Sequence, residues 1–169
     1  MLFNDRNWDG NRGQIFKLAQ DSDVSGVDVE DEVAQAEAFM KDTDNISRLS
    51  EYLGLNLLNF DVNDELEFYY DIERDGRKIG CIYKGWDDHR FKVSEIIPVK
   101  NIESFRANAD KIFNIGATQG VAIGGEIVQN EFQLNLNINI YQGGLNASVL
   151  DESLKTLQFM VEKIKLFMN

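Results

Sequence analysis

The segment 131–141 alternates apolar and polar side chains without interruption. Successive side chains of a β-strand point to opposite faces of a sheet, so this pattern predicts an amphipathic strand. The apolar face would carry Phe132, Leu134, Leu136, Ile138 and Ile140, and the other face Gln133, Asn135, Asn137 and Asn139. Such a strand needs a second layer over its apolar side. We take it as the central strand of the fold.

Two turns predict hairpins. A two-residue Asp75-Gly76 connection joins segments 68–74 and 77–83, and pairing Arg74 with Arg77 would place Tyr70 opposite Cys81 on an apolar face. A Gln129-Asn130 turn would pair segment 121–128 with the strand 131–141, with Ile123 opposite Leu136 and Ile127 opposite Phe132. A third strand, with Phe91 and Val93 on one face, should end before Pro98, which cannot donate to a ladder.

Apolar residues at helical spacing predict the remaining elements. An N-terminal helical segment is interrupted at 42–45, with Asn45 capping its second piece. A middle helix runs from an Asn101 cap to Gly116, and a long C-terminal helix starts near Ser148 and Asp151. The last helix has a narrow apolar stripe, which fits either a helix lying across the sheet or a dimer seam.

These elements predict an α+β fold. After the N-terminal helical segment, the chain order would be three strands, a helix, two strands and a helix. The strands would form one antiparallel β-sheet, backed by the N-terminal helical segment, the middle helix and the long C-terminal helix. Residues 1–26 are rich in Asn, Asp and Gly and predict a partly ordered N-terminal arm. Residues 27–169 would form a single α+β domain.

The charge balance limits the partners. The net charge of −12 argues against nucleic acid or anionic lipid, whose phosphates are neutralised by lysine and arginine. The chain shows neither a signal peptide nor an apolar run long enough to span a membrane, so we expect a cytoplasmic protein. With one cysteine, Cys81, it cannot form an internal disulfide.

The segment 21–32 matches the calcium-loop pattern of an EF-hand. Asp21, Asp23, Ser25 and Glu32 would supply oxygen ligands, and Gly26 the sharp bend. The alternative is an acidic helix start, in which carboxylates favour the positive end of the helix dipole. Ca²⁺ is the only cofactor that the sequence suggests. Zinc is excluded because the chain has too few thiol and imidazole groups to bind it.

Catalytic groups are sparse. The only histidine, His89, falls in a polar turn, and Cys81 falls on the apolar side of the expected hairpin without an evident activating base. Neither glycine pair, 124–125 nor 143–144, forms a phosphate loop. We therefore expect a protein that is not an enzyme.

The order of elements, the small acidic size and the ending resemble a known family. The stretch from Glu126-Ile127-Val128 to Ile140, then Leu145 and the long helix, is similar to the YbjN-type domain and to the class I chaperones of type III secretion. The resemblance covers roughly residues 46–168. It implies an antiparallel sheet backed by helices, usually dimeric, and a regulator or a chaperone that wraps an extended segment of its partner. It implies no catalytic residues.

The leading functional hypothesis is a non-enzymatic protein-binding module that cradles a protein or peptide segment. Gln133, Asn135, Asn137 and Asn139 would form the binding row, opposite the small residues Ala122 and Gly124. The row could equally be an ordinary solvated face. Two alternatives are an acidic inhibitor or decoy covering a basic, nucleic-acid-binding surface, and a calcium-responsive module using the 21–32 loop.

Overall fold

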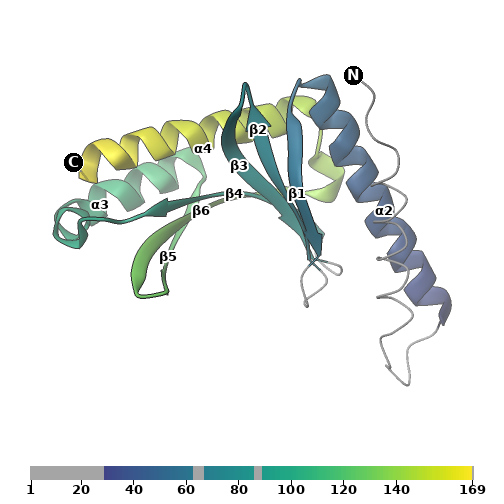
Figure 1. Ribbon diagram of the computed structural model, residues 1–169, viewed down its shortest axis with the longest axis horizontal. Helices are drawn as coiled ribbons and strands as arrows, with labels where there is room; N and C mark the ends of the chain where they lie inside the picture. The colour runs from purple at the N-terminus through teal and green to yellow at the C-terminus, as the bar shows by residue number, and fades with distance from the viewer. Residues whose placement is uncertain (1–28, 63–66, 86–88, 169) are drawn as a thin grey trace. The chain divides into compact units, whose positions relative to one another are not determined.

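A computed structural model describes residues 29–62, 67–85 and 89–168 (Figure 1). Contacts divide the chain into two compact units, Met1–Arg48 and Leu49–Asn169, and each is described by itself. The predicted arm, residues 1–26, lies outside the described residues.

One helix, α2 (Val29–Tyr52), runs from the first unit into the start of the second. The predicted interruption at 42–45 is wrong. Thr43 Oγ1 donates to the Met40 carbonyl and Ser47 Oγ donates to the Thr43 carbonyl, so these polar side chains bond to the preceding turn and leave the helix continuous. Gly54, with φ +65°, follows the end of the helix, and the Leu55 N–H donates to the Ser50 carbonyl.

The second unit is built on one antiparallel sheet, and the α+β fold is confirmed. Its strands lie in the order β1-β2-β3-β4-β6-β5. Their bounds are β1 Asn56–Val62, β2 Phe68–Arg74, β3 Arg77–Lys84, β4 Arg90–Pro98, β5 Ala122–Val128 and β6 Glu131–Tyr141. Two details differ from the prediction: β1 adds a strand before the first hairpin, and β6 lies beside the edge strand β5 instead of at the centre.

The register of the first hairpin is wrong beyond its turn. Arg74 pairs with Arg77 as predicted, but a bulge then shifts β3, so that Tyr70 faces Ile82 and Asp71 faces Cys81. At the bulge, Gly80 has φ +151°, a conformation that side chains rarely adopt. Because a one-residue shift moves every side chain to the other face, Cys81 lies opposite to where the sequence placed it.

The second hairpin has the predicted register. Ile123 pairs with Leu136 and Ile127 with Phe132, and both turn residues, Gln129 and Asn130, have positive φ. On the neighbouring strand β4, Phe91 and Val93 lie on one face, as predicted, and are fully buried. The predicted end before Pro98 is wrong, because β4 includes Pro98, which lies opposite Gln133.

Helix α3 (Ile102–Gln119) starts at the predicted cap, where Asn101 Oδ1 accepts from the Ser104 N–H at 3.0 Å. Its predicted end at Gly116 is wrong, because the helix continues to a left-handed Gly120. Helix α4 (Ala147–Met168) follows a short 3-10 turn, η1 (Gln142–Gly144). Asn146, and not Ser148, caps it, with Oδ1 accepting from the Val149 N–H at 3.1 Å.

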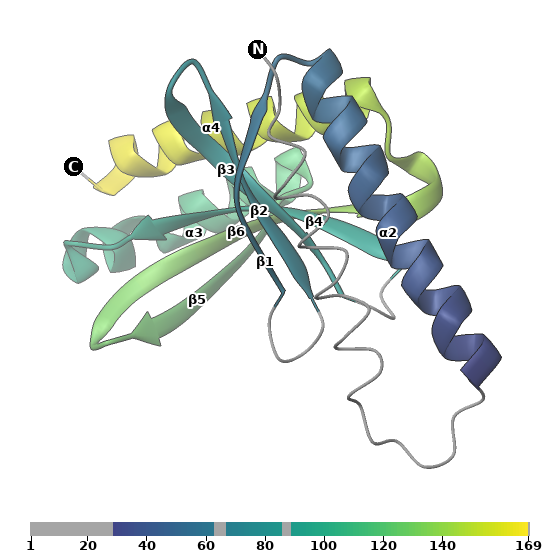
Figure 2. The same ribbon diagram turned by 45° about the vertical axis from the view of Figure 1, so that its right-hand side comes forward.

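Helices α3 and α4 lie side by side on one face of the sheet (Figures 1 and 2). The apolar stripe of α4 packs on β3, β4 and β6, as the first reading of that stripe predicts. Its residues Leu150, Leu154, Leu157 and Ile164 are at most 1% exposed. We call the helix-covered side the helix face and the other side the open face. Within the described residues, no helix has the length and apolarity needed to span a membrane.

Candidate functional site

The predicted polar row lies on the open face. Asn135 and Asn137 are opposite Gly124 and Ala122 of β5, as the register predicts, while Leu134 and Leu136 are fully buried on the helix face. Alternation along β6 therefore places its buried apolar side chains on the helix face and its amide side chains on the open face.

Asn135 and Asn137 line a hollow of about 430 Å³ on this face. Strands β1 to β5 contribute its other walls, which include Tyr69, Tyr83, Ile96 and Glu126. Gln133 and Asn139 lie on the same face of β6 but outside this lining. The candidate surface is thus concave and partly aromatic. The four polar residues of β6 alone would have predicted a flat surface of amide side chains.

The hollow is also acidic. Asp61, Glu67 and Glu126 line it together with the two asparagines. Hydrogen bonds from the Asn135 and Gln133 amides lower the pKa of Glu126 below its usual value, so this carboxylate stays ionised at neutral pH. Lys92 lies over the Tyr83 ring, 5.2 Å from its centroid, and its Nζ is 3.9 Å from Glu67. Carboxylates therefore dominate the charge of the lining.

Within the hollow, Asn135 keeps an unused acceptor. Its Oδ1 is shielded from solvent and has no hydrogen-bond partner within the described residues. An acceptor of this kind gains a hydrogen bond when a donor reaches it. Asn137, by contrast, accepts from the Tyr83 hydroxyl at 3.2 Å.

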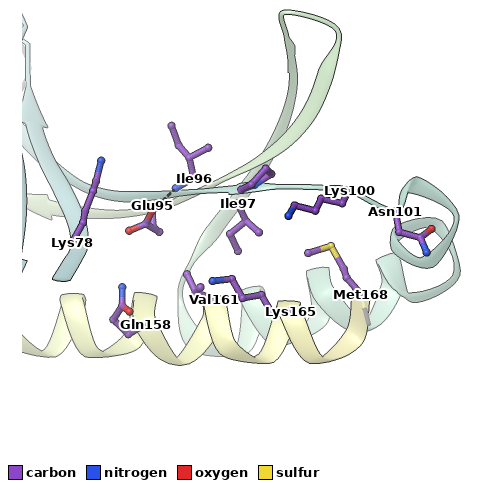
Figure 3. Close-up of a pocket in the computed structure, with 11 residues that line it drawn as sticks. Lys78, Glu95, Ile96, Ile97, Lys100, Asn101, Gln158, Val161, Lys165 and Met168 are labelled. Atoms are coloured by element: carbon purple, nitrogen blue, oxygen red, sulfur yellow. Dashed lines mark hydrogen bonds between the residues drawn. The ribbon is translucent and has the colours of Figure 1, made fainter.

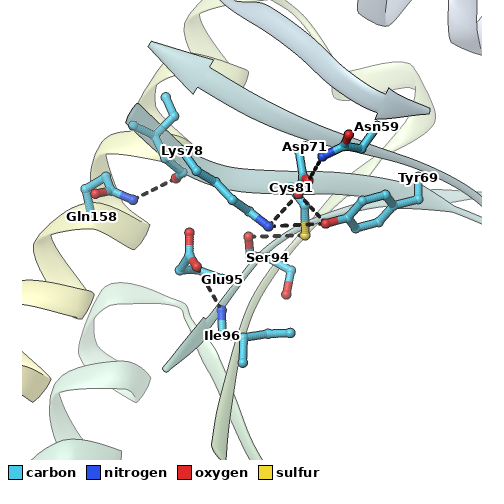
Figure 4. A network of polar contacts seen from close by, with 10 residues as sticks. Asn59, Tyr69, Asp71, Lys78, Cys81, Ser94, Glu95, Ile96 and Gln158 are labelled. Carbon is cyan, nitrogen blue, oxygen red and sulfur yellow. Dashed lines mark hydrogen bonds and ion pairs between the residues drawn. The ribbon is translucent and has the colours of Figure 1, made fainter. Parts of the chain in front are cut away.

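A polar network borders the hollow (Figure 4). Asp71 accepts from three donors: the Tyr69 hydroxyl, Lys78 Nζ and, at 2.7 Å, Asn59 Nδ2. Lys78 Nζ also donates to the Tyr69 hydroxyl at 3.3 Å. Burial alone would raise the pKa of Asp71, but the three donors outweigh it and lower the pKa.

The network holds its groups in unreactive states. Burial and then the hydrogen bond to Asp71 raise the pKa of Tyr69, and burial raises the pKa of the neighbouring Cys81 thiol to about 11. Burial lowers the pKa of Lys78, but its bonds to Asp71 and Tyr69 reverse this and raise it. A neutral thiol, a neutral phenol and an ion-paired ammonium are poor nucleophiles or bases at neutral pH.

The metal and histidine candidates fall elsewhere. Asp21, Asp23 and Ser25 lie outside the described residues, and Glu32 belongs to the first turns of α2. Among the residues that the structure describes, no three His, Cys, Asp or Glu side chains are close enough together to hold a metal ion. His89 is exposed at the start of β4, and its carbonyl accepts from the Gln142 N–H.

Sequence reasoning missed the contributions of β2 and β3 to this site. Tyr69 and Asp71 share the open face by alternation along β2, and Cys81 joins them only because of the bulge, which the expected register lacked. The signal was Gly80, since an isolated glycine within a strand pattern indicates a bulge.

Comparisons with known proteins bear on the fold alone. No protein-family model and no curated protein matches the chain. Among solved structures, the chain is similar to a crystal structure of an uncharacterized protein from Methanothermobacter thermautotrophicus. The TM-score is 0.61 at 14% identity, over 75% of this chain and 96% of that chain.

Proposed function

We propose that this chain is a non-enzymatic protein-binding module, of chaperone or regulator type, that cradles a partner segment on the open face. The observation that carries the proposal is the hollow of β6, where Asn135 offers an unused buried acceptor between aromatic side chains and carboxylates. Extended peptides are recognised by such combinations of polar contacts and side-chain pockets.

The chemistry of the lining favours a polar segment that carries lysine or arginine. Asp61, Glu67 and Glu126 would attract cationic side chains, and Tyr69 and Tyr83 would support their aliphatic parts. The small residues Ala122 and Gly124 leave room for a main chain over the open face of β5, and a Cβ at Gly124 would meet no atom within 4 Å.

A peptide array followed by fluorescence titration tests this proposal. The double variant Asn135→Lys and Asn137→Lys adds charge and bulk in the hollow, so we expect at least a roughly tenfold loss of affinity for the peptides that the native chain selects. The matched control is Asn114→Lys with Gln119→Lys, which adds the same charge on exposed positions of α3. Equal binding by both double variants would remove the open face as the site.

An inhibitor or decoy that covers a basic surface is a second candidate. The carboxylates of the hollow and the net charge of −12 favour it. Such binding depends on many screened charges, so affinity should fall steeply between about 0.05 and 0.5 M salt. A cradled peptide held also by buried contacts should lose much less affinity.

A calcium-responsive module is a further proposal from the 21–32 sequence, and calorimetry with Ca²⁺ on the native chain and Asp21→Ala tests it.

A further inference from the structure

A second hollow, of about 690 Å³, lies on the helix face between the end of β4 and α4 (Figure 3). Its volume falls within the roughly 300–1,000 Å³ of small-molecule sites. It shares Ile96 with the open-face hollow, but the proposed function makes no use of its side toward α4.

A split in the sheet creates this hollow. The β3–β4 ladder ends at the pair Cys81 and Ser94, and beyond it β4 pairs only with β6. Side chains replace the missing ladder: Gln158 Nε2 of α4 donates to the Ile79 carbonyl at 2.7 Å, and Glu95 Oε1 accepts from the Ile96 N–H at 3.1 Å. Two backbone groups at the edges of the split therefore have side-chain partners.

The lining of the hollow is mixed, with an apolar part between β4 and α4. Ile97 of β4 lies above Val161 and Met168 of α4, and Pro98 continues the same wall. This lining favours an alkyl chain over a polar ligand.

Two ammonium groups give the hollow a positive side. Lys100 and Lys165 line it, and neither ammonium group has a hydrogen bond or ion pair within the described residues. In Figure 3 both side chains extend into the space between β4 and α4. In a chain of net charge −12, two unpaired lysines on one partly apolar hollow favour an anionic ligand. Glu95, in the same lining, disfavours a doubly charged group such as phosphate.

We infer that this hollow binds a medium-chain monocarboxylate, with the alkyl chain against Ile97, Val161 and Met168 and the carboxylate between Lys100 and Lys165. Lys78 also lines the hollow, but its ammonium already bonds to Asp71 and Tyr69, which leaves Lys100 and Lys165 opposed by Glu95. One negative charge on the ligand balances these three groups, and lysine pairs with carboxylate as a point charge.

Calorimetry on the full chain with decanoate tests the inference. We expect saturable binding of decanoate, no binding of decyltrimethylammonium, which has the same chain and opposite charge, and no binding of acetate, which lacks the chain. Lys100→Gln with Lys165→Gln should weaken decanoate at least about tenfold. The matched control, Lys111→Gln with Lys163→Gln, removes the same charge elsewhere and should bind as the native chain does.

Absence of decanoate binding overturns the inference, as does equal binding of the cationic detergent or equal weakening by both lysine pairs. Met168→Trp should fill the hollow and reduce decanoate binding while leaving Lys100 and Lys165 in place. Circular dichroism of each variant verifies folding. The open-face variant Asn135→Lys with Asn137→Lys should keep decanoate binding, so failure of the proposed function is distinguishable from failure of this site.

Discussion

At the scale of the residue, Asp71 organises the open face. It accepts from Asn59, Tyr69 and Lys78, which come from β1, β2 and β3. Only 14% of its side chain is exposed, so the three donors replace most of the water that would otherwise solvate the carboxylate. Asp71 therefore links three strands through polar side chains on the open face.

Asp71→Asn should lower the free energy of unfolding by about 1–3 kcal/mol at pH 7, because it removes the charge that Lys78 and Tyr69 bond to. The pKa of Asp71 is lower in the folded state than its ordinary 3.8, so its contribution is present above that value and disappears as the pH falls through the folded-state pKa. The difference between variant and native chain should thus shrink below about pH 4.

Urea titrations at pH 7 and pH 3 measure both differences. Asp110→Asn, on an exposed position of α3, is the control and should change stability by less than about 0.5 kcal/mol. A loss that is the same at both pH values would show that the Asp71 charge is not what stabilises the network.

Cys81 should behave as an inert core thiol. It is 6% exposed, its Sγ donates to the Ser94 carbonyl at 3.5 Å, and burial raises its pKa to about 11. The thiolate is the reactive form, so Ellman's reagent at pH 8 should label the folded chain orders of magnitude more slowly than the chain in guanidinium. Immediate stoichiometric labelling of the folded chain would contradict the burial of Cys81.

At the scale of the element, α3 approaches β5 closely at Gly116. A Cβ at this position would lie 2.6 Å from Ile123 Cδ1 and 3.1 Å from the Val121 carbonyl oxygen. The Val121 N–H also donates to the Gly116 carbonyl at 2.9 Å. Glycine here permits helix-to-strand contact and does not end the helix. The N-terminal half of α3 contacts the end of α4: Asn108 Nδ2 and Ser104 Oγ of α3 donate to the Phe167 carbonyl of α4.

Gly116→Ala should destabilise the chain by about 1 kcal/mol. Overpacking costs about 1–3 kcal/mol, while alanine regains up to about 1 kcal/mol of helix propensity. Adding Ile123→Val removes the atom that overlaps and should recover part of the loss, as thermal denaturation can measure. Gly124→Ala, which meets no atom, is the control. A stable Gly116→Ala would show that Ile123 repacks without cost.

At the scale of the whole described unit Leu49–Asn169, α4 joins most of the fold. It packs on β3, β4, β6 and α3, and Asp151 in its first turns pairs with Arg74 of β2 at 2.7 Å. The hydrophobic contacts are long-range in sequence, so the sheet and α4 depend on each other for burial of their apolar faces.

Leu157→Ala should lower the free energy of unfolding by about 2–5 kcal/mol, because the side chain is fully buried and its loss leaves a cavity. Leu166→Ala, on the same helix at 67% exposure, should change it by less than about 0.5 kcal/mol. Denaturant unfolding measures both. Equal small effects would mean that the stripe of α4 does not form the core.

The sequence by itself determined the elements whose signals are local. The period of β6, the Asp-Gly and Gln-Asn turns and the Asn101 cap depend on neighbouring residues, and all appear in the structure. Gly80 was a local signal for a bulge, but tertiary structure alone decided the strand register on either side of it, the continuation of α3 past Gly116, the added strand β1 and the hollow around Asn135. Each depends on which backbone lies beside another across many residues, and local propensity carries no information on that pairing.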